Sequence, residues 1–272
     1  MASVLSVDGV GFSYKNPNTK KNRQTLKNIS FSIERGEHIA LIGPNGSGKT
    51  TLFNIICTFL KQDSGKILLN GIDIRSFSDQ NRAKQVSFVP QSVKIDFPYT
   101  SLELILMARY PHKARLDRVD DADLSLAESL MKETGVWEFA SKNVQELSGG
   151  EAQKVILTRS LLQILGDSAA SEPRLLLLDE AMSALDIAAR IGMMKLLSLY
   201  ARRDGISIIA IHHDLHSVYS FTDRVIALKD GELAADGVPQ EVFNAPFLKH
   251  VFSVDAEIVP GKGFFVQDIP VL

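Results

Sequence analysis

Short alternating segments of hydrophobic and polar residues occupy the N-terminal part of the chain, residues 4–40. Phe12–Tyr14 and Ile29–Ile33 are two such segments, and polar loops and Gly36 interrupt the pattern. Alternation of this kind, broken by turn residues, is typical of antiparallel strands with one face buried. The pattern therefore predicts an antiparallel β lobe.

Continuously apolar segments follow further along the chain. His38–Ile42 predicts a buried strand, and Val86–Val89 predicts another. Leu175–Leu178 and Ile206–Ile211 are apolar throughout, which is typical of strands buried on both faces of a parallel sheet. Asp230-Gly231, between two further strand-like runs, predicts a hairpin turn.

Helical spacing characterises two further regions. Apolar residues recur at helical intervals from Leu52 to Leu60, which predicts a helix that ends before Gly65. The segment 101–141 is helical in pattern and rich in polar residues, and it predicts a helical lobe inserted into the core. The segment 166–173 predicts a surface loop. The succession of strands and helices predicts an α/β fold, with a mostly parallel core sheet and two peripheral lobes.

Composition excludes several classes of protein. The 272 residues are 45% hydrophobic and 23% charged, an ordinary globular balance, and the net charge of −2 argues against a dedicated nucleic-acid surface. The tight basic cluster of Lys20, Lys21 and Arg23 predicts a solvated hairpin loop. The single cysteine, Cys57, cannot form an internal disulfide, which fits a reducing compartment, and its place in the predicted helix predicts a buried thiol.

Membrane and export signals are not predicted. No apolar run approaches the roughly 20 residues that a membrane helix needs. The N-terminus lacks the basic stretch and apolar run of a secretory signal. If the protein serves transport, we therefore expect another chain to form the pore.

A glycine-rich loop carries the clearest chemistry. Residues 43–50 read Gly-Pro-Asn-Gly-Ser-Gly-Lys-Thr, the phosphate-binding-loop pattern, between a predicted strand and a predicted helix. Backbone N–H groups of the loop and the helix N-terminus bind phosphate. Lys49 is expected to reach the β- and γ-phosphates, and the Thr50 hydroxyl is expected to ligate Mg²⁺. The predicted nucleotide-binding residues of this segment are Gly43, Pro44, Asn45, Gly46, Ser47, Gly48, Lys49, Thr50 and Thr51.

Two carboxylates end the predicted strand that begins near Leu175. Asp179 is expected to hold Mg²⁺ through water. Glu180, one residue on, is expected to polarise the attacking water as a general base. Acidic residues often simply end strands, but together with the phosphate loop this pair predicts a hydrolytic site.

Ser148-Gly149-Gly150-Glu151 has two explanations that are compatible. Ser148 and Glu151 form a capping box at the start of a helix. Gly149 and Gly150 lower helix propensity, so capping does not account for them. They are explained if the phosphate of another molecule must approach this helix N-terminus closely.

These motifs, in this order, resemble those of the ATPase subunit of an ATP-binding-cassette (ABC) transporter. The resemblance implies that Tyr14 stacks on adenine, that Gln91 contacts Mg²⁺ and water, and that His213 contacts the γ-phosphate. Ser148–Glu151 then corresponds to the signature motif, which meets the nucleotide of a second copy across a dimer. Asp186 lies in a loop expected to touch that second copy. His212 and His216 also make a zinc site conceivable, although the order of motifs selects His213.

The resemblance implies an organisation as well as a site. It predicts a phosphate-loop NTPase core in one ABC ATPase domain, residues 1–272, that binds ATP and Mg²⁺. Its implied partners are a second copy, membrane permease subunits and, indirectly, a substrate-binding protein, and nucleic acid is not among them. Its implied location is the cytoplasmic face of the cell membrane. The implied parts are a core and β lobe at about 1–95 and 155–240, a helical lobe at about 96–154, and a C-terminal tail at about 241–272.

The cargo is indicated by the segment after Gln91. Phe97–His112 and the tail from Gly237 to Asp255 resemble importer ATPases for iron–siderophore complexes, haem and cobalamin. Zinc and manganese importers share features of the first segment and form the alternative. Ala152, Ala181 and Met182 depart from common family residues without touching the expected chemistry. A soluble ABC-type switch and a small-molecule kinase are further alternatives. The switch is disfavoured because the sequence shows no coiled-coil insertion and no second cassette. The kinase is disfavoured because the Ser148–Glu151 motif would have no function in it.

Overall fold

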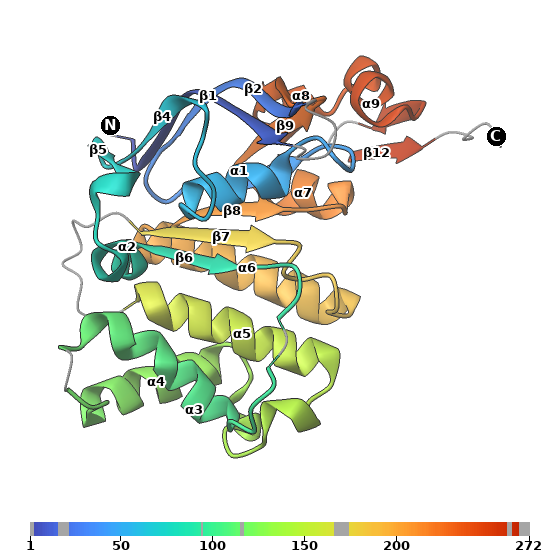
Figure 1. The fold of residues 1–272 in the computed structure, drawn as a ribbon. Helices are drawn as coiled ribbons and strands as arrows, with labels where there is room; N and C mark the ends of the chain where they lie inside the picture. Colours follow the sequence, from blue (N-terminus) through green and yellow to red (C-terminus); the bar gives the residue numbers. More distant parts are fainter. Residues whose placement is uncertain are drawn as a thin grey trace.

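The computed structural model describes residues 3–15, 22–93, 95–114, 117–165, 174–259 and 263–266. A six-stranded sheet lies at its centre, in the order β10-β9-β3-β8-β7-β6 (Figure 1). Its neighbouring strands are parallel, except for the antiparallel pair β9 and β10. The strands are β3 (His38–Ile42), β6 (Val86–Val89), β7 (Leu175–Asp179), β8 (Ser207–Ile211), β9 (Arg224–Lys229) and β10 (Glu232–Gly237).

The continuously apolar runs form the middle of this sheet. Every residue of β3, β7 and β8 is buried, as the sequence predicted. Asp230 and Gly231 form the predicted hairpin turn between β9 and β10, both with positive φ. Because parallel strands have their carboxyl ends at one edge, the loops after β3, β6, β7 and β8 emerge together. The candidate site is built from these loops.

The predicted antiparallel β lobe is a four-stranded sheet, in the order β2-β1-β4-β5. Its strands are β1 (Leu5–Lys15), β2 (Asn22–Ile33), β4 (Ser64–Leu69) and β5 (Ile72–Asp73). The sequence pattern missed β4, because its first three residues are exposed and only Ile67 and Leu69 are fully buried. A short 3-10 helix, η1 (Ile74–Ser76), follows the lobe.

Helix α1 (Lys49–Ile56) lies between the two sheets and packs against both (Figure 1). It is shorter than the sequence predicted: the apolar residues recur at helical intervals as far as Leu60, but the helix ends at Ile56. Thr58 has a φ of +64° and its N–H bonds to the Ile55 carbonyl, which ends the helix. Phe59 is 66% exposed, and Gly65 lies inside β4 instead of beyond a helix end. Cys57 caps α1 and is buried as predicted, and burial raises the pKa of its thiol to about 12.

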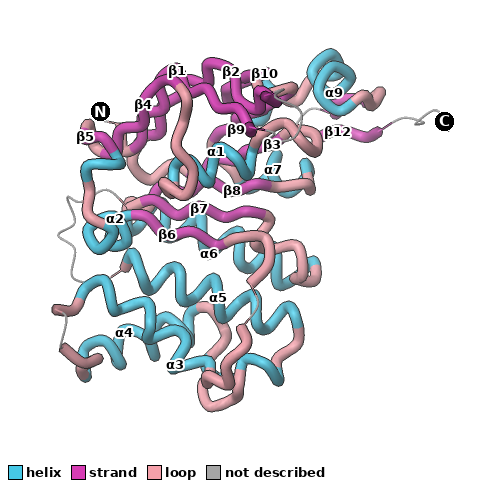
Figure 2. The backbone as a smooth tube through the Cα atoms, viewed as in Figure 1, coloured by secondary structure: helices cyan, strands magenta, loops and turns pink. Residues whose placement is uncertain are grey.

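The other face of the central sheet is covered by helices (Figures 1 and 2). Their apolar residues form one cluster with β6, β7 and β8, so the predicted helical lobe shares its core with the sheet. The elements are α2 (Asp79–Gln85), α3 (Ser101–Leu106), η2 (Met107–His112), α4 (Asp121–Glu133), η3 (Trp137–Phe139), η4 (Val144–Glu146), α5 (Gly149–Ile164) and α6 (Ile187–Asp204).

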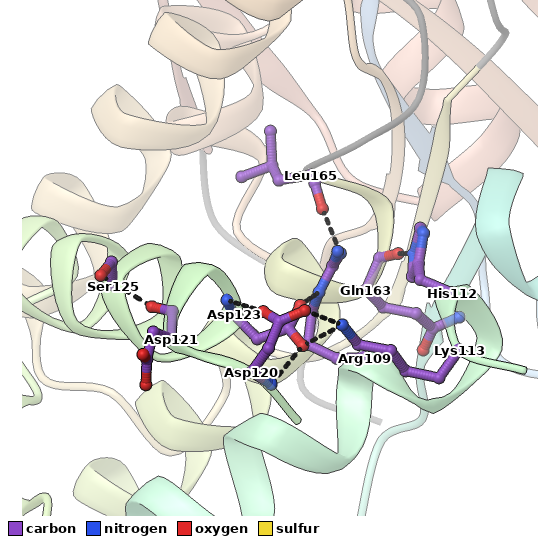
Figure 3. A network of polar contacts seen from close by, with 9 residues as sticks. All are labelled: Arg109, His112, Lys113, Asp120, Asp121, Asp123, Ser125, Gln163 and Leu165. Atoms are coloured by element: carbon purple, nitrogen blue, oxygen red, sulfur yellow. Dashed lines mark hydrogen bonds and ion pairs between the residues drawn. The ribbon is translucent and has the colours of Figure 1, made fainter. Parts of the chain in front are cut away.

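A buried polar network fixes η2 to its neighbours (Figure 3). The Arg109 guanidinium bonds to Asp123 at 2.7 Å and to the Leu165 carbonyl at 3.0 Å, and Lys113 lies 2.6 Å from both Asp120 and Asp123. His112 bonds to the Gln163 carbonyl at 2.7 Å. Arg109 and His112, two polar residues of the segment 97–112, therefore bind groups inside the protein.

The C-terminal elements cover the β9 side of the sheet. They are α7 (Leu215–Phe221), α8 (Pro239–Val242), α9 (Ala245–Phe252), β11 (Ala256–Val259) and β12 (Gly263–Val266). Phe243, Leu248 and Phe264 pack with Ala40 and Ile42 of β3 in a separate cluster. The predicted loop at 166–173 lies outside the described residues, as do Lys20 and Lys21.

Candidate functional site

The phosphate loop joins β3 to α1, and three of its glycines have backbone angles that favour glycine. Gly43, Gly46 and Gly48 have φ values of +145°, +78° and +105°. A Cβ on Gly43 would lie 2.0 Å from the Leu228 carbonyl oxygen, so this position has no room for a side chain. The loop geometry expected from the sequence is therefore present, with Lys49 and Thr50 at the first helical turn.

Lys49 is folded back onto the loop. Its ammonium donates to the carbonyls of Gly43 at 2.8 Å and Pro44 at 3.0 Å. Burial lowers the pKa of Lys49, and the carboxylates of Glu180 and Asp179 oppose that shift. The ammonium thus lies between the loop and the two acidic residues, where the negative charge of a phosphate would bind.

The residues at the end of β7 fit a hydrated Mg²⁺. Burial raises the pKa of Asp179, and a hydrogen bond with Thr50 opposes the shift. Asp179 Oδ1 and Ser47 Oγ are buried and have no hydrogen-bond partner. Buried oxygens without partners are costly unless a ligand or water satisfies them. Carboxylate and hydroxyl oxygens are also the groups that Mg²⁺ prefers.

Glu180 is held from two sides. Gln91, after β6, donates from Nε2 to one carboxylate oxygen at 2.6 Å. His213, after β8, contacts the other through its Nε2 at 2.5 Å. Glu180 also has a φ of +51°, in the left-handed region that a residue with a side chain seldom adopts. Strain of this kind is often found at functional sites, where surrounding contacts maintain it.

Tyr14 brings the β lobe to the same cleft. Its hydroxyl lies 3.3 Å from Thr51 Oγ1, and its ring packs edge-on against Phe12. Glu180 and the phosphate loop line this cleft of about 240 Å³ together with Tyr14. Arg23 lines it too, on β2 opposite Tyr14 in the strand register. The sequence reasoning placed Arg23 in a solvated hairpin loop; it lies in a strand instead, and only its register with Tyr14 identifies it.

Ser148 and Glu151 form the predicted capping box at the start of α5. The two glycines after Ser148 differ in their surroundings. A Cβ on Gly150 would lie 3.2 Å from the Ala184 carbonyl oxygen, whereas a Cβ on Gly149 would meet nothing within 4 Å. Close packing inside the chain therefore accounts for Gly150, and nothing inside the described chain requires glycine at Gly149.

The loop after Glu180 is tied to this helix start. Gln153 accepts a hydrogen bond from the Ala184 N–H at 2.9 Å, and Asp186 caps α6 by accepting from the Ala189 N–H at 2.8 Å. Sequence reasoning missed Gln153. The Ser148–Glu151 segment does not line the Tyr14 cleft. Instead, Gly149 and Ser183 border a separate hollow of about 220 Å³ beside Gln91.

The two histidines beside His213 have separate environments. His212 is buried, and burial lowers its pKa to about 3. His216 stacks on Phe264 with ring centroids 4.7 Å apart. Within the described parts of the chain, no three His, Cys, Asp or Glu side chains gather as a metal site would require. The zinc alternative therefore receives no support from this geometry.

Comparison with known proteins identifies the family of this site. The sequence profile of the family described as "ABC transporter" matches residues 26–183. The chain belongs to the ABC transporter family. It is an ABC ATPase, with the α/β fold that the sequence predicted.

Two relatives of this ABC ATPase have named cargo. The iron(3+)-hydroxamate import ATP-binding protein FhuC of Bacillus subtilis is 32% identical over 94% of this chain and 90% of its own. The hemin import ATP-binding protein HmuV of Rhizobium meliloti is 37% identical over 85% of this chain and 86% of its own.

Two solved structures share the fold of the ABC ATPase. A chain of a transporter assigned to the metal-chelate type, in an inward-facing conformation, superposes with a TM-score of 0.78 at 23% identity, over 99% of this chain and 98% of that one. The dimeric ATP-binding cassette MJ0796, bound to ADP and Pi, gives a TM-score of 0.71 at 26% identity, over 86% and 98%. Among the helices described for this protein, none has the length and apolar character to span a membrane.

Proposed function

We propose that this protein is the ATP-hydrolysing subunit of an importer for iron–siderophore complexes, hemin or a related metal chelate. The observation that carries the hydrolytic part is the pair of contacts that hold Glu180, from Gln91 at 2.6 Å and from His213 at 2.5 Å, at the rim of a cleft that contains Lys49. The named relatives FhuC and HmuV support the cargo class over zinc and manganese.

Residues of one chain bind the nucleotide in this proposal. Tyr14 stacks on adenine, while the amides of the phosphate loop and Lys49 bind the phosphates. Thr50, Asp179 and Gln91 would hold Mg²⁺, which would neutralise phosphate charge. Lys49 then leaves its loop carbonyls for the β- and γ-phosphates.

Glu180 acts as the general base. Each of its oxygens accepts one hydrogen bond from Gln91 or His213 and retains a further lone pair for water. The water proton moves to Glu180 as the water oxygen attacks the γ-phosphorus. Gln91 and His213 fix the direction of the carboxylate, and His213 contacts the γ-phosphate.

A second copy completes the site. Gly149 has open space around its Cα and lies at the N-terminus of a 16-residue helix, where an anion is stabilised by backbone N–H groups. The Ser148–Glu151 segment, lying outside its own chain's cleft, would meet the γ-phosphate bound by the other copy. Asp186 would lie at the same contact between the two copies. The solved structure of the cassette MJ0796 is a dimer.

Docking to a permease would place the protein at the cytoplasmic face of the membrane. We expect the segment 97–112 to face the permease. Leu104 is buried in the core and is not available for such a contact. Phe97 and Tyr110 are the large exposed apolar side chains of this segment. They are the residues through which docking can be tested.

The hydrolytic proposal is tested with Glu180→Gln. This variant should bind ATP, lose nearly all turnover and form an ATP-dependent dimer of doubled mass in gel filtration. Glu232→Gln, at an exposed surface ion pair with Lys27, is the control and should hydrolyse normally. Steady-state hydrolysis by Glu180→Gln at the wild-type rate would remove Glu180 from its role.

The cargo proposal is tested in a strain that lacks the protein. Uptake of radiolabelled ferric hydroxamate or hemin should fall, and wild-type protein should restore it. Tyr110→Glu should restore uptake poorly while retaining ATP binding. Normal uptake of both iron compounds combined with loss of zinc or manganese uptake would support the alternative cargo and contradict this proposal.

A further inference from the structure

A C-terminal hairpin packs on the helix that follows His213. Strands β11 and β12 pair in an antiparallel register, and β12 contacts α7. Phe264 on β12 is 3% exposed, whereas the next residue, Phe265, is 57% exposed. The Phe264 side chain is therefore buried against the protein, and the Phe265 side chain lies in solvent.

The ring of Phe264 joins two other rings. Its centroid lies 5.4 Å from that of Phe243 and 4.7 Å from that of His216, with interplanar angles of 27° and 14°. Phe243 is buried in the cluster that contains Ile42, the last residue of β3 before the phosphate loop. Phe264 thus connects the His216 side chain to the fixed core of the protein.

His216 lies in the first turn of α7, close to His213. Asp214 caps this helix and accepts hydrogen bonds from the N–H groups of His216 at 3.2 Å and Ser217 at 3.4 Å. The backbone from Asp214 to Ser217 is therefore closed into one hydrogen-bonded turn. A displacement of the His216 ring would be transmitted to Asp214 and to its neighbour His213, which contacts Glu180.

We propose that Phe264 is a positioning residue for hydrolysis: its stack on His216 holds the start of α7 so that His213 reaches Glu180. The inference rests on the proposed function of Glu180 and His213. Phe264, His216 and His213 lie outside residues 26–183, the part that the family profile matches. The C-terminal hairpin is then a support for the catalytic centre and not only a cover for the sheet.

Phe264→Ala and Phe264→Leu test the stack in the full-length protein. Alanine removes the ring, and leucine keeps an apolar side chain but cannot stack face to face. Small displacements of a catalytic group lower rates strongly, so kcat should fall on the order of tenfold in both variants. KM should stay near its wild-type value, because Lys49 and Tyr14 are not touched. Phe265→Ala, on the exposed face of the same strand, is the matched control and should retain full activity.

Histidine imidazole signals in ¹H–¹³C NMR provide a readout that is independent of turnover. Phe264→Leu should shift the signals of His216, through loss of the ring current, and of His213, through its displacement. His250, exposed on α9, should be unchanged. If Phe264→Ala does not fold, Phe264→Leu decides the question by both measurements.

The inference and the proposed function fail in different ways. Wild-type kcat in a folded Phe264→Leu variant, or an unmoved His213 signal, would overturn the positioning role while Glu180→Gln still abolished hydrolysis. A fall in kcat equal to that of Phe265→Ala would also overturn it. Wild-type protein that binds ATP without hydrolysing it would instead contradict the proposed function.

Discussion

Asp123 is the acceptor at the centre of the buried network of the helical lobe (Figure 3). It accepts hydrogen bonds from Arg109 at 2.7 Å and from the Asp120 N–H at 3.2 Å, and it lies 2.6 Å from Lys113. Contacts with Lys113 and Arg109 hold its pKa at about 2, below the usual value, against the effect of burial. Asp123→Asn keeps the shape of the side chain and removes its charge, so it isolates the electrostatic part.

The expected loss of stability is large, because a buried cation would lose its carboxylate partner. Arg109 is 1% exposed, and a guanidinium cannot release its proton in a protein. Breaking a buried ion pair in this way costs about 3–5 kcal/mol. For a chain of this size, each kcal/mol lowers Tm by about 2–4 °C. Asp123→Asn should therefore lower Tm by roughly 6–20 °C.

Asp120→Asn is the matched control, from the same helix start and the same network. Its side chain is 58% exposed at the ion pair with Lys113, and asparagine caps helices as well as aspartate does. Loss of such an exposed pair should cost less than about 1 kcal/mol. Thermal unfolding followed by circular dichroism at pH 7 gives the Tm of both variants, and urea unfolding gives their free energies of unfolding.

The double variant Arg109→Met/Asp123→Leu separates the charge from the packing. Replacing both members of a buried pair with apolar residues is often nearly neutral, so this protein should be more stable than Asp123→Asn. The reasoning would be refuted if Asp123→Asn and Asp120→Asn lost the same stability. A double variant less stable than Asp123→Asn would refute it as well.

Four further predictions follow from single contacts. Lys49→Ala should weaken ATP binding as well as abolish hydrolysis, because it removes a charge that binds the ground state; unchanged affinity by calorimetry would contradict this. Gly149→Ala should leave the thermal stability of the monomer unchanged or slightly raised, but should reduce ATP-driven dimerisation of Glu180→Gln in gel filtration, since its Cβ meets nothing inside the chain. Gln153→Ala should lower kcat, whereas Gln153→Glu, which keeps an acceptor for the Ala184 N–H, should retain most of the wild-type kcat. Equal activities of the two variants would show that the hydrogen bond to Ala184 does not support hydrolysis. Burial lowers the pKa of His38 to about 4, so His38 binds a proton near pH 6.5 in the unfolded chain but not in the folded chain. The contribution of His38 should therefore make the protein about 2 kcal/mol less stable at pH 5 than at pH 7. Urea unfolding of His38→Gln at the two pH values should lack that part of the pH dependence.

The buried strands of the core sheet and the chemistry of the loops could be predicted from the sequence alone. Continuous apolar runs identify β3, β7 and β8, because a strand buried on both faces has no polar positions. The phosphate loop, Asp179, Glu180 and the Ser148 capping box are local motifs, and their residues follow one another in the chain. Positive φ angles are a local reason for glycine at Gly43 and Gly48, whereas the close approach of the Leu228 carbonyl to Gly43 comes from the fold.

Only the tertiary structure determined which distant residues share a contact. The end of α1 at Ile56 depends on packing between two sheets, and apolar spacing alone carried the predicted helix to Leu60. Arg109 and His112 have partners far along the chain, the Leu165 and Gln163 carbonyls, which no local pattern identifies. Arg23 joined the nucleotide cleft through strand register, and Phe264 reached His216 through the packing of the C-terminal hairpin. The physical reason is the same in each case: local patterns record which face of an element is buried, but the partner on that face is set by how the elements fold together.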